Sequence, residues 1–206
     1  MKIKFLFLAL ALAAQVAFPA PVAAQAPTEV QLTAELLEQT YCTVNTEISL
    51  QLKIKLRYTN LSPHPVILYR GHDLFFQTKL RSEPDAAGRT YQVLLLNMHY
   101  FDEEFERISA RSPSKVFVTL APNQSFERQL IKGIGVTDQS KERSSTSVYP
   151  GEHTLQLTVS TWYQSPKLAE QLREQWRRKG VLVSLPLTSL PLKLVVEKPT
   201  TSPTCR

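Results

Sequence analysis

Hydrophobic and polar residues alternate along much of the chain, most clearly over residues 47–60. Apolar or aromatic side chains occupy every even position from 48 to 58, and polar ones occupy the positions between them. Successive side chains of a strand point to opposite faces, so this period of two predicts an antiparallel strand with one buried face. We expect the strand to end within residues 60–65, because an asparagine and two prolines favour a turn there.

Weaker versions of this pattern predict further strands, separated by polar turns. The turn residues at 121–124 predict a hairpin, residues 81–89 a polar turn, and residues 133–135 a strand end or bulge. Residues 30–42 fit another strand, although 34–39 also fits a helical turn, and the polar residues 137–147 fit a mobile loop. The predicted additional strands are 66–69, 74–80, 90–98, 115–120, 125–131, 152–162 and 190–197.

One segment, residues 166–179, has a helical period instead. Ser165 suits the N-cap, a proline follows at the first helical position, and Gly180 suits the C-terminal end. Leu168, Leu172 and Trp176 recur at every fourth position and therefore share one face. Eight or nine strands with this one short α-helix near the C-terminus predict an all-β fold, an antiparallel β-sandwich. A closed barrel is the alternative.

Three segments carry a resemblance to a known fold: YTNLSPHPVILYRG, FVTLAPNQSFE and YPGEHTLQLTVSTW, in this order. A long alternating strand with an asparagine turn, a proline-turn hairpin and a glycine-led strand resemble bacterial secreted immunoglobulin-like β-sandwich domains. The resemblance covers residues 47–162, and the predicted helix departs from it. It implies an immunoglobulin-like sandwich that acts as an accessory or inhibitor-like module. It transfers no functional residue to this chain.

The first residues predict export. Lys2 and Lys4 precede an unbroken apolar run over 5–14, and small residues at 22–24 suit cleavage after Ala24. Cleavage after Ala26 is the rival site, and an uncleaved anchor is the other alternative. We therefore predict a signal peptide over 1–24, one domain over 25–198 and a tail over 199–206, with no transmembrane segment in the mature chain. The expected location is the periplasm or the extracellular medium.

Composition adds the expectation of a disulfide. The chain has 206 residues, of which 43% are hydrophobic and 20% charged, as is typical of a globular protein. Its two cysteines, Cys42 and Cys205, are too few for a disulfide-dense miniprotein. In an oxidising compartment they are expected to pair, closing a loop of nearly the whole domain. A bond from Cys205 to another chain is the alternative.

Charge and aromatic residues suggest two binding surfaces. The net charge is +6, and residues 165–206 carry eight basic and three acidic side chains. Cations near a helix end are common, but these could also contact an acidic protein or a membrane surface. Nucleic acid is disfavoured, because few aromatic side chains accompany the cations. The basic candidates are Arg173, Arg177 and Arg178, and the candidate aromatic anchors are Tyr100, Phe101 and Phe105.

The chain shows no motif for catalysis, a cofactor or a metal. It lacks Gly-x-Ser-x-Gly, and no two of its histidines have metal-ligand spacing. We expect an exported, non-catalytic module that binds a protein partner through loops at 70–73, 98–113 and 139–149. The alternative is a secreted metal-dependent or hydrolytic enzyme. Its candidate residues are His72, Asp73, His99 and Asp102.

Overall fold

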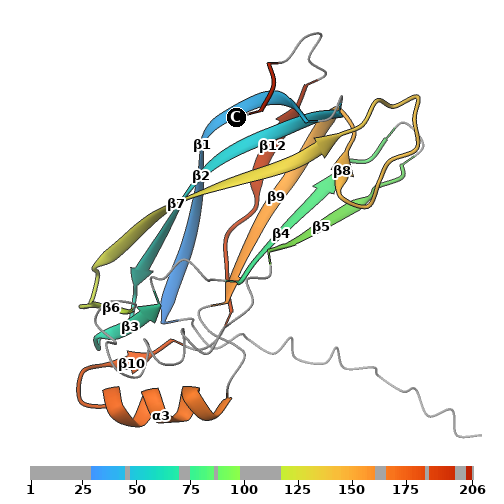
Figure 1. The fold of residues 1–206 in the computed structure, drawn as a ribbon. Coiled ribbons are helices and arrows are strands. Elements are labelled where there is room, and N and C mark those ends of the chain that lie inside the picture. The colour runs from blue at the N-terminus through green and yellow to red at the C-terminus, as the bar shows by residue number, and fades with distance from the viewer. Residues whose placement is uncertain are drawn as a thin grey trace, which may run out of the picture.

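A computed structural model describes strands over most of the chain and one helix (Figure 1). The structure describes residues 29–44, 47–69, 75–85, 88–97, 117–160, 166–183, 186–197 and 203–205. The elements are β1 (Val30–Val44), β2 (Glu47–Asn60), β3 (Val66–Tyr69), β4 (Phe75–Ser82), β5 (Gln92–Asn97), β6 (Phe117–Leu120), β7 (Ser125–Val136), β8 (Ser147–Val148), β9 (Gly151–Ser160), α3 (Pro166–Trp176), β10 (Val181–Leu182), β11 (Leu187–Thr188) and β12 (Leu192–Val196).

The first sheet has the strand order β1-β2-β7-β8. The alternating strand predicted at 47–60 is confirmed as β2, whose even positions from Leu50 to Tyr58 are buried. The helical alternative at 34–39 is wrong, because β1 pairs with β2 along its whole length, with one bulge between Leu36 and Glu38. Pairing along β2 satisfies the backbone hydrogen bonds that a helical turn would otherwise have made locally.

The second sheet has the order β11-β9-β4-β5, and β12 also pairs with β9. On β4, Phe76, Thr78 and Leu80 are buried, as their predicted shared face requires. The uniformly apolar sequence of β5 does not predict which of its side chains face the core. In the structure Val93 is buried and Leu94 is exposed. The predicted polar turn begins later than expected, because residues 81 and 82 still pair with β9.

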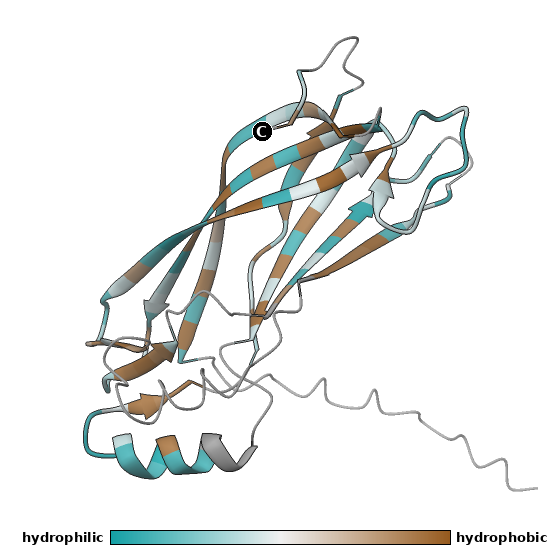
Figure 2. Ribbon diagram, viewed as in Figure 1, coloured by the Kyte–Doolittle hydropathy of each residue, from teal (hydrophilic) through white to brown (hydrophobic). Residues whose placement is uncertain are grey.

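A small sheet, β10-β3-β6, lies beside α3 at one end of the molecule (Figure 1). The predicted helix is confirmed, but it ends at Trp176 and residues 177–179 form a turn. Leu172 and Trp176 are buried, whereas most of the helix is hydrophilic (Figure 2). Gly180 has φ +155°, and a Cβ there would lie 2.5 Å from the carbonyl oxygen of Pro65. A glycine is therefore needed where the chain leaves α3 for β10.

The turn at 121–124 is confirmed, but the hairpin pairing predicted around it is wrong. β6 pairs with β3, whereas β7 pairs with β2 and β8, so the two strands enter different sheets. β7 also runs on through residues 133–135, where a strand end or bulge was expected. Gly133 lies against the Gln51 side chain, whose Nε2 would be 3.0 Å from a Cβ at that position. The missing side chain lets the ladder continue there.

The two larger sheets face each other across one hydrophobic core. The core draws on β1, β2 and β7 from the first sheet and on β4, β9 and β12 from the second. The expectation of a mostly β fold with one short helix is confirmed. The fully antiparallel arrangement is not, because β8 runs parallel to β7 and β10 runs parallel to β3. These two-residue strands follow irregular connections whose direction the alternation pattern does not encode.

Side chains and the C-terminal tail hold the β1 edge of the first sheet against its neighbours. Gln39 donates to the carbonyl of Val195 on β12, and the hydroxyl of Tyr41 accepts from the backbone N–H of Glu197. The Cys205 N–H donates to the carbonyl of Thr43. The predicted disulfide between Cys42 and Cys205 is present, with Cα atoms 4.8 Å apart. Residues 203–205 therefore lie along the end of β1, where Thr204 forms a parallel bridge with Thr43.

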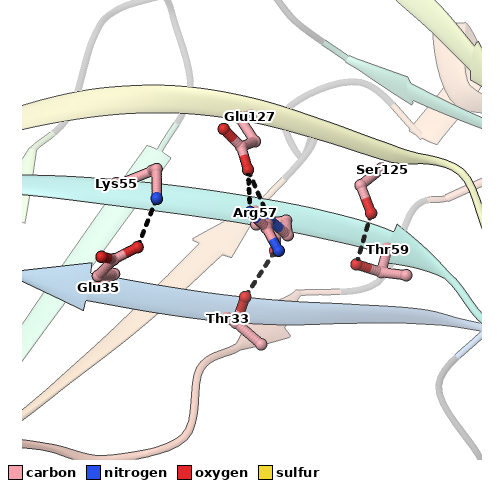
Figure 3. A network of polar contacts seen from close by, with 7 residues as sticks. All are labelled: Thr33, Glu35, Lys55, Arg57, Thr59, Ser125 and Glu127. Carbon is pink, nitrogen blue, oxygen red and sulfur yellow. Dashed lines mark hydrogen bonds and ion pairs between the residues drawn. The ribbon is translucent and has the colours of Figure 1, made fainter.

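The outer face of the first sheet carries a neutralised ladder of charges (Figure 3). Lys55 forms an ion pair with Glu35 on β1, and Arg57 forms one with Glu127 on β7. Thr59 and Ser125 continue the row with a hydroxyl–hydroxyl hydrogen bond of 2.9 Å. The basic side chains on this face of β2 are Lys53, Lys55 and Arg57. Two of them, Lys55 and Arg57, are therefore paired with acids from the neighbouring strands.

Candidate functional site

An open cleft of about 790 Å³ lies where the β4–β5 turn meets the β8–β9 turn. This end of the two sheets is opposite α3 (Figure 1). Strand pairing brings the two turns together, because Ser82 at the end of β4 pairs with His153 near the start of β9. The cleft is lined by Ser82, Glu83, Pro84, Asp85, Arg89, Thr90, Tyr91, Gln139, Tyr149, Pro150, Gly151, Glu152 and His153.

A chain of hydrogen bonds fixes the floor of the cleft. The Nδ1 atom of His153 lies 3.0 Å from the carbonyl oxygen of Gly151, which can only accept, so Nδ1 carries the proton. Nε2 must then accept from the hydroxyl of Tyr91, 2.8 Å away. The same hydroxyl oxygen accepts from the backbone N–H of Tyr149 at 2.8 Å. Every donor in this chain has an acceptor, which defines one tautomer of the histidine.

The environment keeps this histidine neutral. Burial lowers the pKa of His153, and the hydrogen bond to Gly151 and the charge of Glu83 oppose that effect only in part. Burial likewise raises the pKa of Tyr91. Both ring nitrogens of His153 form hydrogen bonds, one to Tyr91 and one to Gly151, so the ring stabilises the turn between β8 and β9. A free general base would need an available nitrogen facing the cleft.

Aromatic packing surrounds the same floor. The ring of Tyr91 makes edge contacts with the rings of Tyr149 and His153, at centroid distances of 5.7 and 5.8 Å. The guanidinium carbon of Arg143 lies 4.5 Å from the Tyr91 ring centroid. A cation in this position gains from the ring quadrupole. The floor of the cleft is therefore rigid, and its aromatic groups already hold one cation.

We expect the Tyr91→Phe substitution to lower the free energy of unfolding by about 1–3 kcal/mol, the usual cost of leaving buried polar groups without partners. Without the Tyr91 hydroxyl, the backbone N–H of Tyr149 and the Nε2 atom of His153 would have no hydrogen-bond partner. Urea denaturation at pH 7 measures it. Tyr149→Phe is the matched control, because it removes only the exposed hydrogen bond from that hydroxyl to the carbonyl of Lys141. Equal losses in the two variants would contradict the assignment.

The rim of the cleft is acidic. Asp85 is paired with Arg89, which donates through its backbone N–H and its side chain, so these two charges offset each other. Glu83 and Glu152 form no ion pair with a described residue. Their backbones are joined by a hydrogen bond of 3.0 Å from Glu83 N to Glu152 O, so the two residues are neighbours on adjacent strands. Among the described residues, the rim thus presents two carboxylates without a cationic partner to a ligand.

The structure places one set of sequence-predicted binding residues and leaves another outside the described residues. Arg173 pairs with Glu170 and Arg177 with Glu174, so much of the basic charge of α3 is offset within its own segment. Arg178 lies in the turn after the helix and is exposed. Outside the described residues lie Tyr100, Phe101, Phe105, His72, Asp73, His99 and Asp102, and also the loops 70–73 and 98–113 in full.

The described residues bring no three His, Cys, Asp or Glu side chains together as a metal site would require. α3 has 11 residues and a largely polar surface, and the described part of the chain holds no helix that could cross a membrane. Of the three loops expected to carry binding, residues 139–149 do reach the cleft, through Gln139 and Tyr149.

Comparisons with known proteins give little to set beside this geometry. The chain matches no protein-family model and no curated protein. It is similar to an X-ray structure of a Northeast Structural Genomics Consortium target, at 11% identity and a TM-score of 0.33, covering 81% of this chain and 85% of that one. It is also similar to a Bordetella pertussis protein provisionally named ApaA, at 13% identity and a TM-score of 0.30, covering 84% and 97%. Similarity this weak carries no argument about function.

The cleft was not predicted from the sequence, although one of its loops was. Tyr91 and His153 are 62 residues apart, and no local pattern connects them. The available signal was modest: a Tyr-Pro-Gly turn enters a strand at 149–151, and the acidic residues 83 and 85 lie in a predicted turn. Only the pairing of β4 with β9 shows that these two turns meet.

Proposed function

We propose that the protein is an exported binding module with an immunoglobulin-like β-sandwich fold, and that its cleft takes a cationic group of a partner protein. Export rests on the predicted signal peptide over 1–24, with which the paired cysteines are compatible. The domain is 25–198, and the tail 199–206 is attached to it through Cys205. The sandwich assignment rests on two facing sheets around one core.

The acidic rim of the cleft is the observation that carries the proposed binding role. Two carboxylates that have no ion-pair partner among the described residues suit a lysine or arginine side chain, which gains from charge-assisted hydrogen bonds. The floor of the cleft is fixed by the hydrogen-bond chain through Tyr91, so little conformational entropy is lost on binding. His153 is committed to the same chain, which favours recognition over catalysis at this site.

A direct test is the affinity of a lysine-rich hexapeptide for the mature chain, measured by isothermal titration calorimetry. We expect the double variant Glu83→Gln/Glu152→Gln to bind about 5- to 30-fold more weakly, since each exposed charge contributes about 0.5–1 kcal/mol. Raising the salt concentration from 0.05 to 0.5 M should weaken the wild type in the same direction.

Glu47→Gln supplies the matched control, because Glu47 is an exposed carboxylate at the start of β2 and does not line the cleft. It should leave the affinity unchanged. If an acidic hexapeptide bound as tightly as the basic one, or if the control lost as much as the double variant, the cationic partner would be ruled out.

A further inference from the structure

The interior between β7 and β4 holds buried polar groups that lack partners. Lys132 is 3% exposed, Tyr58 is 2% exposed and Thr78 is fully buried. Within the described chain, the Lys132 ammonium and the Tyr58 and Thr78 hydroxyls make no hydrogen bond. Buried polar atoms are almost always hydrogen-bonded in native proteins, so three such atoms in one interior require an explanation.

Two cations of this interior, Lys132 and Arg128, lie against one aromatic ring. Arg128 and Lys132 lie four residues apart on β7 and therefore point to the same face. The guanidinium carbon of Arg128 is 5.3 Å from the ring centroid of Phe76, and Nζ of Lys132 is 5.7 Å from it. Thr78 follows Phe76 by two residues on the same buried face of β4, whereas Tyr58 pairs with Phe126, six residues before Lys132 on β7.

The energetics of this arrangement are unfavourable without a counter-charge. A buried cation without an opposite charge is strongly destabilising, and the face of one ring offsets only a small part of the cost. Lys132 forms no ion pair with a carboxylate in the described residues. Burial lowers the pKa of Lys132 to about 8, so its side chain is still charged in most molecules at neutral pH. Lys132 is thus a buried charge for which the described residues supply no counter-charge, and an anion would neutralise it.

The chemistry of the cluster specifies what would bind. Its ammonium, its guanidinium and the Thr78 hydroxyl can all donate, so the complementary ligand accepts hydrogen bonds and carries negative charge. Its neighbours are apolar: Lys132 pairs across the ladder with Leu52, and Thr78 pairs with Leu157. We propose that Lys132, Arg128 and Thr78 form an internal site for a carboxylate that carries an apolar chain. The long stems of the two cations can move to admit it.

The test uses ligand-free mature protein and three straight-chain carboxylates: acetate, hexanoate and decanoate. We expect calorimetric affinity to rise with chain length, up to about fourfold per added CH₂ for groups that become fully buried. Decanol, which has the same chain without the charge, should bind at least about tenfold more weakly than decanoate, as expected for a lost charge-assisted hydrogen bond. The Lys132→Met variant should lose that preference for decanoate, whereas Lys79→Met should keep it, because Lys79 is exposed on the opposite face of β4.

Several results would overturn the proposal. Equal affinities for decanoate and decanol would show that charge plays no role in binding. A higher affinity for inorganic phosphate than for hexanoate would exclude a carboxylate as the ligand. A Lys132→Met variant with undiminished preference for decanoate would place the site elsewhere. If that variant does not fold, the side-chain nitrogen NMR signal of Lys132 in the wild type decides, because decanoate must shift it. An unshifted signal at saturating decanoate would contradict the site.

Discussion

Loss of the disulfide between Cys42 and Cys205 should lower the free energy of unfolding by up to about 5 kcal/mol. The bond closes a loop with a sequence separation of 163 residues. A cross-link across a loop of this length removes a large part of the conformational entropy of the unfolded chain. Domains of this size typically have only about 5–15 kcal/mol of stability, so the loss would be a large fraction of the total.

The measurement is urea denaturation of the oxidised protein, the reduced protein and the double variant Cys42→Ala/Cys205→Ala. The reduced wild type and the variant should lose similar amounts, because the entropic effect resides in the unfolded chain. In both, the unfolding free energy should also fall more steeply with urea concentration than in the oxidised protein, since an unlinked unfolded chain exposes more surface. A loss below about 1 kcal/mol would show that strain in the folded state cancels the entropic gain.

The second large effect concerns Lys132 and pH. We expect Lys132→Met to raise the free energy of unfolding of the ligand-free protein by up to about 3 kcal/mol at pH 7. Burial lowers the pKa of Lys132 to about 8 in the folded protein, whereas an unfolded lysine titrates near 10.4. Each unit of that difference corresponds to about 1.4 kcal/mol, and methionine occupies similar space without the buried charge.

The same shift sets the pH dependence. Between about pH 8 and 10 the unfolded chain binds a proton at Lys132 that the folded chain has lost, so stability rises with pH in this window. Above pH 10 the trend should reverse, because burial raises the pKa of Tyr58 and the unfolded tyrosine ionises first. The charged neighbour of Lys132 in the described interior is Arg128, which lies over the same Phe76 ring.

Thermal denaturation from pH 7 to 10 compares the wild type, Lys132→Met and Lys79→Met. The wild type and the exposed control should both gain stability with pH, and Lys132→Met should lose most of that gain. Parallel profiles in all three proteins would show that Lys132 carries no buried charge.

The strands that the sequence predicts best are those with strict alternation. β2 appears with the predicted bounds, because six apolar side chains at every second position can be buried together only on a strand. α3 appears because its start, its apolar face and its end are marked by independent local signals. Its C-terminal bound shifts by three residues, to Trp176, where the chain turns toward β10.

The candidate sites were harder to predict, because each depends on residues far apart in the sequence. Lys132 and Arg128 occupy alternate positions of β7 that resemble the polar face of an ordinary strand. The burial of Lys132 follows from the pairing of β7 with β2, which turns that row toward Phe76. The cleft similarly requires Ser82 to pair with His153 before its two turns meet.

The sequence by itself determined most of the longer strands, where the helix lies and that two cysteines were available to pair. These are local properties, written in the period of apolar residues and in turn and cap residues. The tertiary structure alone decided that β6 and β7 enter different sheets, that β8 and β10 run parallel to their neighbours, and that the buried Lys132 faces an aromatic ring. The physical reason is that pairing and register are chosen by the total burial and hydrogen bonding of distant segments, which no short stretch of sequence encodes.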